Sequence, residues 1–153
     1  DKLGLQTVAL TEHEDKYKDL GIDCIADLAP NQGPLGGIES AFAQLNTPYI
    51  LLLSCDMPNL TEELLRLLIS KTPNSSEYSH FCSEQKTHPF PAIVAKSTQK
   101  IVNELLTNKK NKSMMNFIRQ LNHVNTLEIT SDHAAFFNMN TKEEHAYLNN
   151  KGK

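Results

Sequence analysis

The sequence has little that would support a disulfide scaffold, a membrane span or a bulk electrostatic grip on nucleic acid. Its three cysteines, at positions 24, 55 and 82, are odd in number and widely spaced, which predicts neither paired disulfides nor a CxxC zinc site. The longest apolar run, YILLL at 49–53, is too short to cross a bilayer, and the opening DKLGLQ has no apolar core typical of a signal peptide. The net charge of −3 argues against nucleic-acid binding by overall charge and leaves a local basic patch as the alternative. Together these absences favour a globular protein of the reducing cytoplasm.

Several catalytic and nucleotide-binding motifs are also missing. There is no GxSxG elbow of a serine hydrolase, and the six histidines include no HExxH zinc motif. Neither the GxxxxGK(S/T) loop nor the GxGxxG dinucleotide fingerprint occurs. The apolar share of 39% and the charged share of 22% suit a folded protein. At about 100–200 residues per domain, the 153 residues predict one domain over 1–153.

The hydrophobic pattern predicts strands that alternate with helices. Short apolar or β-branched runs predict strands at 7–10, 22–26, 49–54, 78–83, 91–95, 126–129 and 134–138. Helical spacing predicts helices at 14–20, 38–45, 59–72, 96–106, 113–121 and 141–148. We expect Asn59 to cap the third helix and the run at 49–54 to be buried on both faces. This order is typical of an α/β domain with a largely parallel sheet, in which ligands bind outside the carboxyl ends of the strands.

Two loops that follow predicted strands carry candidate binding residues. Asp56 comes directly after the most apolar strand, where a carboxylate suits a Mg²⁺ ion shared with substrate phosphates. An Asp that only bonds nearby backbone amides is the alternative. Asp27 begins a loop predicted over 27–37, in which Gly36 and Gly37 have no Cβ and would let a base or ribose approach the backbone. An ordinary Pro/Gly connection would have the same composition.

Further polar candidates lie in the second half of the chain. Lys112 belongs to a small basic cluster that could clamp a phosphate, although such a cluster is also typical of a solvated loop. Asn138 and Asn140 would face the same side of an extended segment and could bond a polar ring, or they could form a strand end and turn. His88 precedes Pro89, which favours an extended backbone, and a single histidine there is often a structural hydrogen-bonding group.

Four segments occur in an order that resembles a known family. They are GPLGGI at 33–38, SCDMP at 54–58, HPFPAIV at 88–94 and FFNMNTKEE at 136–144. In combination they resemble the MobA-type molybdenum cofactor guanylyltransferases, whereas CDMP alone recurs in related nucleotidyltransferases. The resemblance implies a Rossmann-like nucleotidyltransferase fold, a three-layer sandwich with helices on both faces of a mostly parallel sheet. It also implies transfer of GMP from GTP to the phosphate of molybdopterin, with release of pyrophosphate.

The resemblance also implies a role for each candidate residue. Asp56 would be the catalytic residue that binds Mg²⁺, the implied cofactor. Thr11, Asp27, Gly36 and Gly37 would lie against GTP, together with Asp56. The implied molybdopterin side consists of His88, Lys112, Asn138 and Asn140. The implied partners are GTP, molybdopterin, other molybdenum-cofactor biosynthesis proteins and recipient molybdoenzymes, with neither nucleic acid nor membrane.

The chain departs from the family pattern at three points. It has no counterpart of the LAGGxSxRMGxDK-like loop with which the family begins. We therefore expect the chain to lack roughly the first 40 residues of a family member, including the first strand of the sheet. We also expect the enzymatic activity of residues 1–153 alone to be reduced. Thr11 stands where the family often has Asn, and a hydroxyl cannot bond as an amide does. Lys142 replaces a proline, which alters only a helix start. A CTP-dependent cytidylyltransferase and a non-catalytic nucleotide- or cofactor-binding module of the same fold remain alternatives.

Overall fold

The strands of the protein form two sheets in the described part of the chain. The structure is a computed structural model and describes residues 3–13, 15–84, 86–108, 111–130 and 133–136. In the smaller sheet, β1 (Val8–Thr11) runs parallel to β2 (Asp23–Ala26). The larger sheet contains, in spatial order, β3 (Tyr49–Leu52), β5 (Lys86–Ala95), β4 (Tyr78–Ser83) and β6 (Val124–Glu128). The predicted parallel pairing is found for β1–β2 and β4–β6. The strand β5 is antiparallel to both of its neighbours, β4 and β3. Its pairing with β4 is that of two consecutive strands joined by a short turn.

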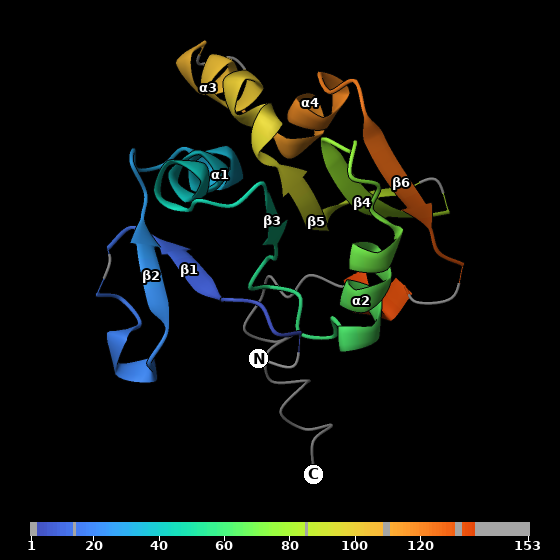
Figure 1. Cartoon of the computed structure of the whole chain (residues 1–153), viewed down its shortest axis with the longest axis horizontal. Helices are drawn as coiled ribbons and strands as arrows, with labels where there is room; N and C mark the ends of the chain where they lie inside the picture. Colours follow the sequence, from blue (N-terminus) through green and yellow to red (C-terminus); the bar gives the residue numbers. More distant parts are fainter. Residues whose placement is uncertain (1–2, 14, 85, 109–110, 131–132, 137–153) are drawn as a thin grey trace.

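Helices cover both faces of the larger sheet (Figure 1). The α-helices are α1 (Gly33–Gln44), α2 (Glu62–Lys71), α3 (Gln99–Thr107) and α4 (Met114–Arg119), and the 3-10 turns are η1 (Lys18–Leu20), η2 (Lys96–Thr98) and η3 (His133–Phe136). Side chains cap two helix starts: Thr61 accepts the N–H of Leu64 in α2, and Ser113 accepts the N–H of Asn116 in α4. Within the ranges given above, no helix is both long and apolar enough to cross a membrane.

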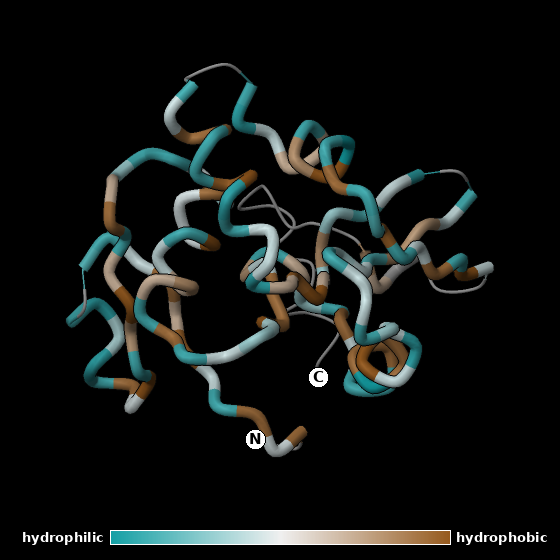
Figure 2. The backbone as a smooth tube through the Cα atoms, turned by 45° about the horizontal axis from the view of Figure 1, so that its top comes forward, coloured by the Kyte–Doolittle hydropathy of each residue, from teal (hydrophilic) through white to brown (hydrophobic). Residues whose placement is uncertain are grey.

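Two apolar clusters, one on each face of the larger sheet, hold the layers together. Along β5, Ala92 and Val94 belong to one cluster and Ile93 to the other, as the alternation of a strand requires. The cluster beneath α1, α3 and α4 includes Leu35, Ile38, Phe42, Tyr78, Val102, Leu105 and Phe117. The cluster beneath α2 includes Met57, Leu64, Leu68, Phe81, Ala135 and Phe136. Figure 2 shows hydrophobic stretches alternating with hydrophilic ones along the backbone. Because one apolar cluster lies on each face of the sheet with helices over it, the predicted three-layer arrangement is confirmed.

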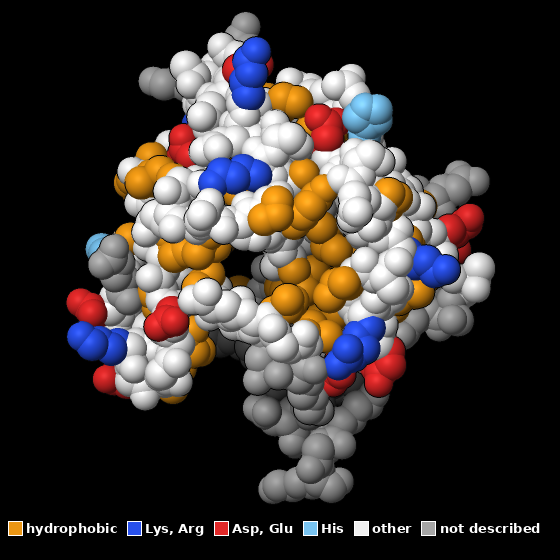
Figure 3. Space-filling model, viewed as in Figure 1, with side chains coloured by type: hydrophobic (Ala, Val, Ile, Leu, Met, Phe, Trp, Pro, Cys, Tyr) orange, Lys and Arg blue, Asp and Glu red, His pale blue; other side chains and the backbone are white. Residues whose placement is uncertain are grey.

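The strand β3 lies at an edge of the larger sheet. Among the described strands it pairs with β5 alone, and residues 49–51 are only half-buried. The prediction that both faces of this strand are covered is confirmed, because Ile50 and Leu52 pack in one apolar cluster of the sheet and Tyr49 and Leu51 pack against the other. Burial is incomplete, and no described strand pairs with the second edge. The strand β1 likewise pairs with β2 alone in this part of the chain. Figure 3 shows the surface hollowed between the β1–β2 pair and β3, with hydrophobic side chains around the hollow.

Three local predictions differ from the structure. The segment 14–20 contains only the turn η1, because that turn buries no residue and an isolated short helix is not stable. The residue that caps α2 is Thr61 and not Asn59, and the helix begins at Glu62. The described part of the predicted strand at 134–138 is the turn η3, whose consecutive residues Ala135 and Phe136 are both buried, unlike those of a strand with one solvent face. The predicted helix at 141–148 lies outside the described residues.

Candidate functional site

The glycine-containing segment after β2 forms the start of α1. The predicted loop over 27–37 is wrong from Gly33 onward, because the helix begins there and not at Ile38. Pro34 lies in the first turn, where a missing N–H removes no helical hydrogen bond. Asn31 and Gly33 adopt left-handed φ angles of 61° and 63°, which turn the chain into the helix. The Pro/Gly composition therefore serves a sharp helix entry.

Gly36 and Gly37 are buried in this first part of α1, where a side chain would not fit. A Cβ on Gly36 would lie 2.6 Å from the Cβ of Gln32, and one on Gly37 would lie 3.0 Å from Cδ1 of Leu10. The two glycines therefore let the helix pack closely on the preceding turn and on β1. Their predicted contact with GTP stays a prediction.

Asp27 is held at the end of β2, beside the end of β1. Its backbone N–H donates to the carbonyl oxygen of Thr11 at 2.8 Å, and the Thr11 hydroxyl donates to the carbonyl oxygen of His13 at 2.6 Å. Burial, and next the carboxylate of Glu12, raise the pKa of Asp27. Its Oδ1 is buried and has no hydrogen-bond partner among the residues described. This oxygen of the Asp27 carboxylate is thus left unsatisfied by the described part of the chain.

Replacing Asp27 by Asn is expected to stabilise the protein at neutral pH. The folded chain holds this proton more tightly than the unfolded chain, whose pKa is 3.8, so the wild type loses stability as the pH rises above that value. An amide has no such dependence. Urea unfolding at about pH 4 and about pH 7 should give a stability difference between Asn and Asp that grows with pH. Asp19→Asn removes the same charge at an exposed position and serves as control; a difference that shrinks with pH would contradict the prediction.

Ser40 connects the turn after Asp27 to α1, and no motif in the sequence singles it out. The side chain is fully buried, and its Oγ accepts the N–H of Leu28 at 2.9 Å and donates to the carbonyl oxygen of Gly36 at 2.8 Å. These bonds fix the backbone that follows Asp27. The only signal in the sequence is a serine within a helical apolar stripe, which does not name its partners.

Asp56 follows β3 in the turn that leads toward α2. It is half-buried, and its Oδ1 is buried without a hydrogen-bond partner in the described part of the chain. The next residue, Met57, is 8% exposed and packs in the cluster beneath α2, which anchors the turn. Cys55, on the other side, is exposed. One oxygen of Asp56 therefore makes none of the backbone bonds that the alternative interpretation requires.

The unsatisfied oxygens of Asp27 and Asp56 suit a hard divalent cation. Carboxylate oxygens are the ligands that Mg²⁺ prefers, and the ion usually keeps several waters and binds substrate phosphates as well. Among the described residues, no group of three or more His, Cys, Asp or Glu is placed to hold a metal by itself. The donor set therefore does not fit an all-protein cage, whereas a single carboxylate such as that of Asp56 fits a magnesium ion whose other ligands are water or substrate oxygens.

Lys112 contacts the turn that precedes α1. Its Nζ donates a hydrogen bond to Oε1 of Gln32, although 80 positions separate the two residues. Both side chains are half-buried. A residue predicted for the molybdopterin side is thus brought to the segment predicted for the nucleotide side. Nothing in the sequence pattern singled out Gln32.

His88 is buried in β5, with an exposed fraction of 8%. Its Nε2 lies 2.6 Å from Oγ of Ser83, and its ring stacks on that of Phe136 with centroids 4.3 Å apart. The interpretation as a structural hydrogen-bonding histidine is confirmed by the Ser83 contact. Its part in binding molybdopterin stays a prediction. Asn138 and Asn140, predicted for the same side, lie outside the described residues.

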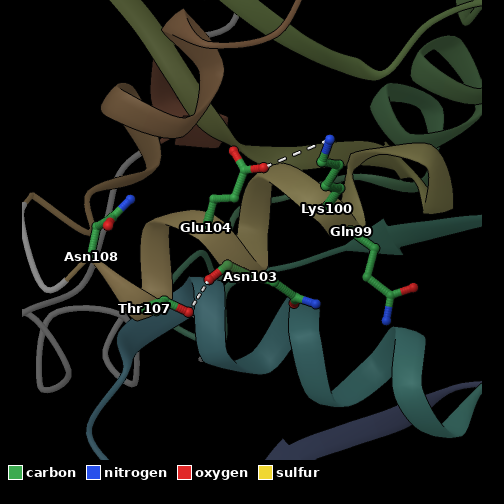
Figure 4. A pocket seen from close by; sticks show the side chains of 6 residues that line it. All are labelled: Gln99, Lys100, Asn103, Glu104, Thr107 and Asn108. Atoms are coloured by element: carbon green, nitrogen blue, oxygen red, sulfur yellow. Dashed lines mark hydrogen bonds and ion pairs between the residues drawn. The ribbon is translucent and has the colours of Figure 1, made fainter.

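Two surface cavities lie away from the predicted site residues. One, of about 520 Å³, follows the polar side of α3 next to α1. In Figure 4, Gln99 and Asn103 point toward α1, while Lys100 and Glu104 form an ion pair at 4.0 Å on the outer side. The other, of about 470 Å³, lies along the β1–β2 pair and includes Asp23 and Cys24. Neither includes Asp56 or another residue proposed to bind substrate.

Comparison with known proteins shows the family to which this chain is related. Residues 4–124 match the family described as "MobA-like NTP transferase domain". The chain belongs to this family. The probable molybdenum cofactor guanylyltransferase of Flavobacterium johnsoniae is 33% identical over 144 residues, which cover 94% of this chain and 75% of that relative. The molybdenum cofactor guanylyltransferase of Histophilus somni is 29% identical over 141 residues, which cover 90% of this chain and 71% of that relative.

Solved structures share the MobA-like fold. The molybdopterin-guanine dinucleotide biosynthesis protein A of Archaeoglobus fulgidus matches with a TM-score of 0.76 and 18% identity, over 97% of this chain and 79% of that chain. A protein of Aquifex aeolicus VF5 matches with a TM-score of 0.74 and 19% identity, over 87% and 70%. The predicted nucleotidyltransferase fold and the predicted family are therefore confirmed. As a MobA-like NTP transferase, the protein is a nucleotidyltransferase.

Proposed function

We propose that the protein transfers GMP from GTP to the phosphate of molybdopterin and releases pyrophosphate. The names of its curated relatives and the ordered GPLGG, CDMP, HP and NMNT segments support this proposal. The observation that carries it is the buried Oδ1 of Asp56, which has no hydrogen-bond partner among the described residues, at the position where the resemblance places the metal-binding carboxylate.

The proposed reaction needs positioning and charge neutralisation more than proton transfer. An anionic oxygen of the molybdopterin phosphate attacks the α-phosphorus of GTP and forms the new P–O bond. The bond from the α-phosphorus to the oxygen that bridges to the β-phosphate breaks, and pyrophosphate leaves with that electron pair. Because the attacking oxygen is already charged, no strong general base is required. This agrees with a chain that has no catalytic triad motif.

Each site residue has a defined task in this proposal. Asp56 holds Mg²⁺, which when bound neutralises charge on the reacting phosphates. Asp27 and Thr11 position the nucleoside beside the start of α1. Lys112 supplies positive charge to a phosphate, and His88 borders the molybdopterin side. The proposed molybdopterin contacts further along the chain are Asn138 and Asn140.

The proposed setting follows from the same chemistry. We assign the enzyme to the cytoplasm, where its three free cysteines, Cys24, Cys55 and Cys82, would stay reduced. Its proposed partners are other proteins of molybdenum cofactor synthesis and the molybdoenzymes that receive the product.

Nucleotide titrations test the proposal. The full-length protein, titrated calorimetrically in Mg²⁺ buffer, is expected to bind GTP at least roughly 10-fold more tightly than CTP, the effect of about one well-placed hydrogen bond. Addition of molybdopterin should then yield pyrophosphate and the guanine dinucleotide in equal amounts. A preference for CTP would replace the proposal with a cytidylyltransferase, and binding without transfer would favour a non-catalytic module.

A further inference from the structure

The contact between Gln32 and Lys112 joins the two turns that carry the proposed substrate residues. Gln32 ends the turn that begins at Asp27, and Lys112 lies in the turn that leads into α4. The ammonium donates to the carboxamide oxygen, and both side chains are half-buried. No ion pair of Lys112 with a carboxylate occurs among the described residues. Its fixed partner is therefore a neutral group.

A neutral acceptor has a specific electrostatic consequence. An Asp or Glu in the place of Gln32 would hold the ammonium equally well and would also cancel its charge. The carboxamide instead fixes the ammonium while its full positive charge remains available to another anion. A phosphate that carries negative charge is stabilised best by a charge that is already in place before the reaction.

Both partners are held by their own backbones. Gln32 stands between two residues with left-handed φ angles, Asn31 and Gly33, and its Cβ lies over Gly36, which leaves its side chain room only because that residue is a glycine. On the other side, Ser113 caps α4 directly after Lys112. The backbone of Lys112 is therefore fixed by the adjacent helix cap, and its Nζ is fixed by the hydrogen bond to Gln32.

We propose that Gln32 is a positioning residue of the transfer reaction, holding the Lys112 ammonium for the anionic phosphate of molybdopterin. This inference rests on the proposed function. Gln32 itself touches neither substrate in this assignment and acts only through Lys112. Loss of the contact would free the ammonium to move with its flexible stem, so the positive charge would be spread over many positions when the phosphate arrives.

The variants Gln32→Glu and Gln32→Met separate a positioning role from a structural one. Met removes the acceptor, whereas Glu keeps an acceptor and neutralises the ammonium. If Gln32 positions a charge, both variants raise the KM for molybdopterin, Glu by roughly 10-fold, the loss of about one charge-assisted contact. The KM for GTP should change less than about 2-fold. Gln120→Glu, which adds the same charge at an exposed position, should leave both constants unchanged.

The stability of the Gln32 variants should change differently from their KM for molybdopterin. Gln32→Glu should unfold at the same urea concentration as the wild type or a higher one, because the contact is kept as an ion pair. A purely structural Gln32 would predict that Glu restores activity together with stability. Wild-type molybdopterin KM in Gln32→Glu, with GMP transfer intact, would overturn this inference and leave the proposed function standing.

A double-mutant cycle tests the contact without any substrate. Gln32→Met, Lys112→Met and the double variant are compared by urea unfolding, and we expect a non-zero coupling free energy between the two sites. Zero coupling would overturn the inference whatever the activity. A wild-type protein that shows coupling and transfers no GMP would overturn the proposed function, and the assignment of this contact to molybdopterin would fall with it.

Discussion

Replacement of Asp56 by Asn is expected to lower the rate of GMP transfer by at least roughly 10²- to 10³-fold, the usual loss when a preorganised electrostatic group is removed. The amide keeps the shape of the side chain but is a far poorer ligand for Mg²⁺. The free energy of unfolding should stay the same or rise, since one carboxylate oxygen is buried without a partner among the described residues. Steady-state kinetics and urea unfolding of the same preparation measure the two effects.

A matched control and a metal titration make the Asp56 result specific. Asp19→Asn removes a carboxylate from the exposed turn η1 and should leave the transfer rate unchanged. Removal of Mg²⁺ with a chelator should abolish GMP transfer by the wild type. Addition of Mg²⁺ should then restore it. The Asp56→Asn protein should need a higher Mg²⁺ concentration for half-maximal rate. An Asn variant with wild-type activity and Mg²⁺ dependence would refute the role given to Asp56.

Replacement of Phe117 by Ala is expected to lower the free energy of unfolding by about 3–5 kcal/mol. The side chain is fully buried between α4 and the larger sheet, and its ring meets that of Tyr78 edge-on at a centroid distance of 5.8 Å. Truncation leaves a cavity and removes the aromatic contact. For a domain stabilised by about 5–15 kcal/mol this is a large share, and urea unfolding followed by circular dichroism measures it.

Two comparison variants show whether packing causes the Phe117 effect. Phe117→Leu fills most of the space and should cost clearly less than Ala, roughly 1–2 kcal/mol. Arg119→Ala, at an exposed position on the same helix, should stay within about 0.5 kcal/mol of the wild type. Equal losses for Leu and Ala would show that the aromatic contact, and not the cavity, dominates. A loss below about 1 kcal/mol for Ala would contradict the packing seen here.

The elements with a strong local pattern could be predicted from the sequence. The apolar run at 49–54 and the isoleucine-containing run at 22–26 form strands at nearly those positions. The start of α1 could not be predicted in this way. Its entry depends on left-handed φ angles at Asn31 and Gly33 and on close packing against β1, both of which are set by the surrounding fold.

Some residues of the candidate site could likewise be predicted from the sequence, and others could not. The positions of Asp27 and Asp56 directly after strands could be predicted from the sequence, and the carboxyl ends of strands are where α/β proteins bind ligands. Their roles in binding stay predictions. Gln32 and Ser40 could not be predicted, since their importance comes from partners far away in the sequence or from hydrogen bonds that only the folded chain brings together. A glutamine before a helix, read alone, does not reveal a lysine 80 positions away.

The uncovered edges of β1 and β3 have a consequence for how copies of this chain behave in solution. Along Tyr49–Leu52, no described strand pairs with the outer edge, and the run holds no charged residue that would repel an added strand. Native proteins usually protect such edges with lysines, prolines or short lengths. The four-residue length of β3 and Pro48 directly before it are two of these protections, so a strand added at this edge would gain few ladder hydrogen bonds.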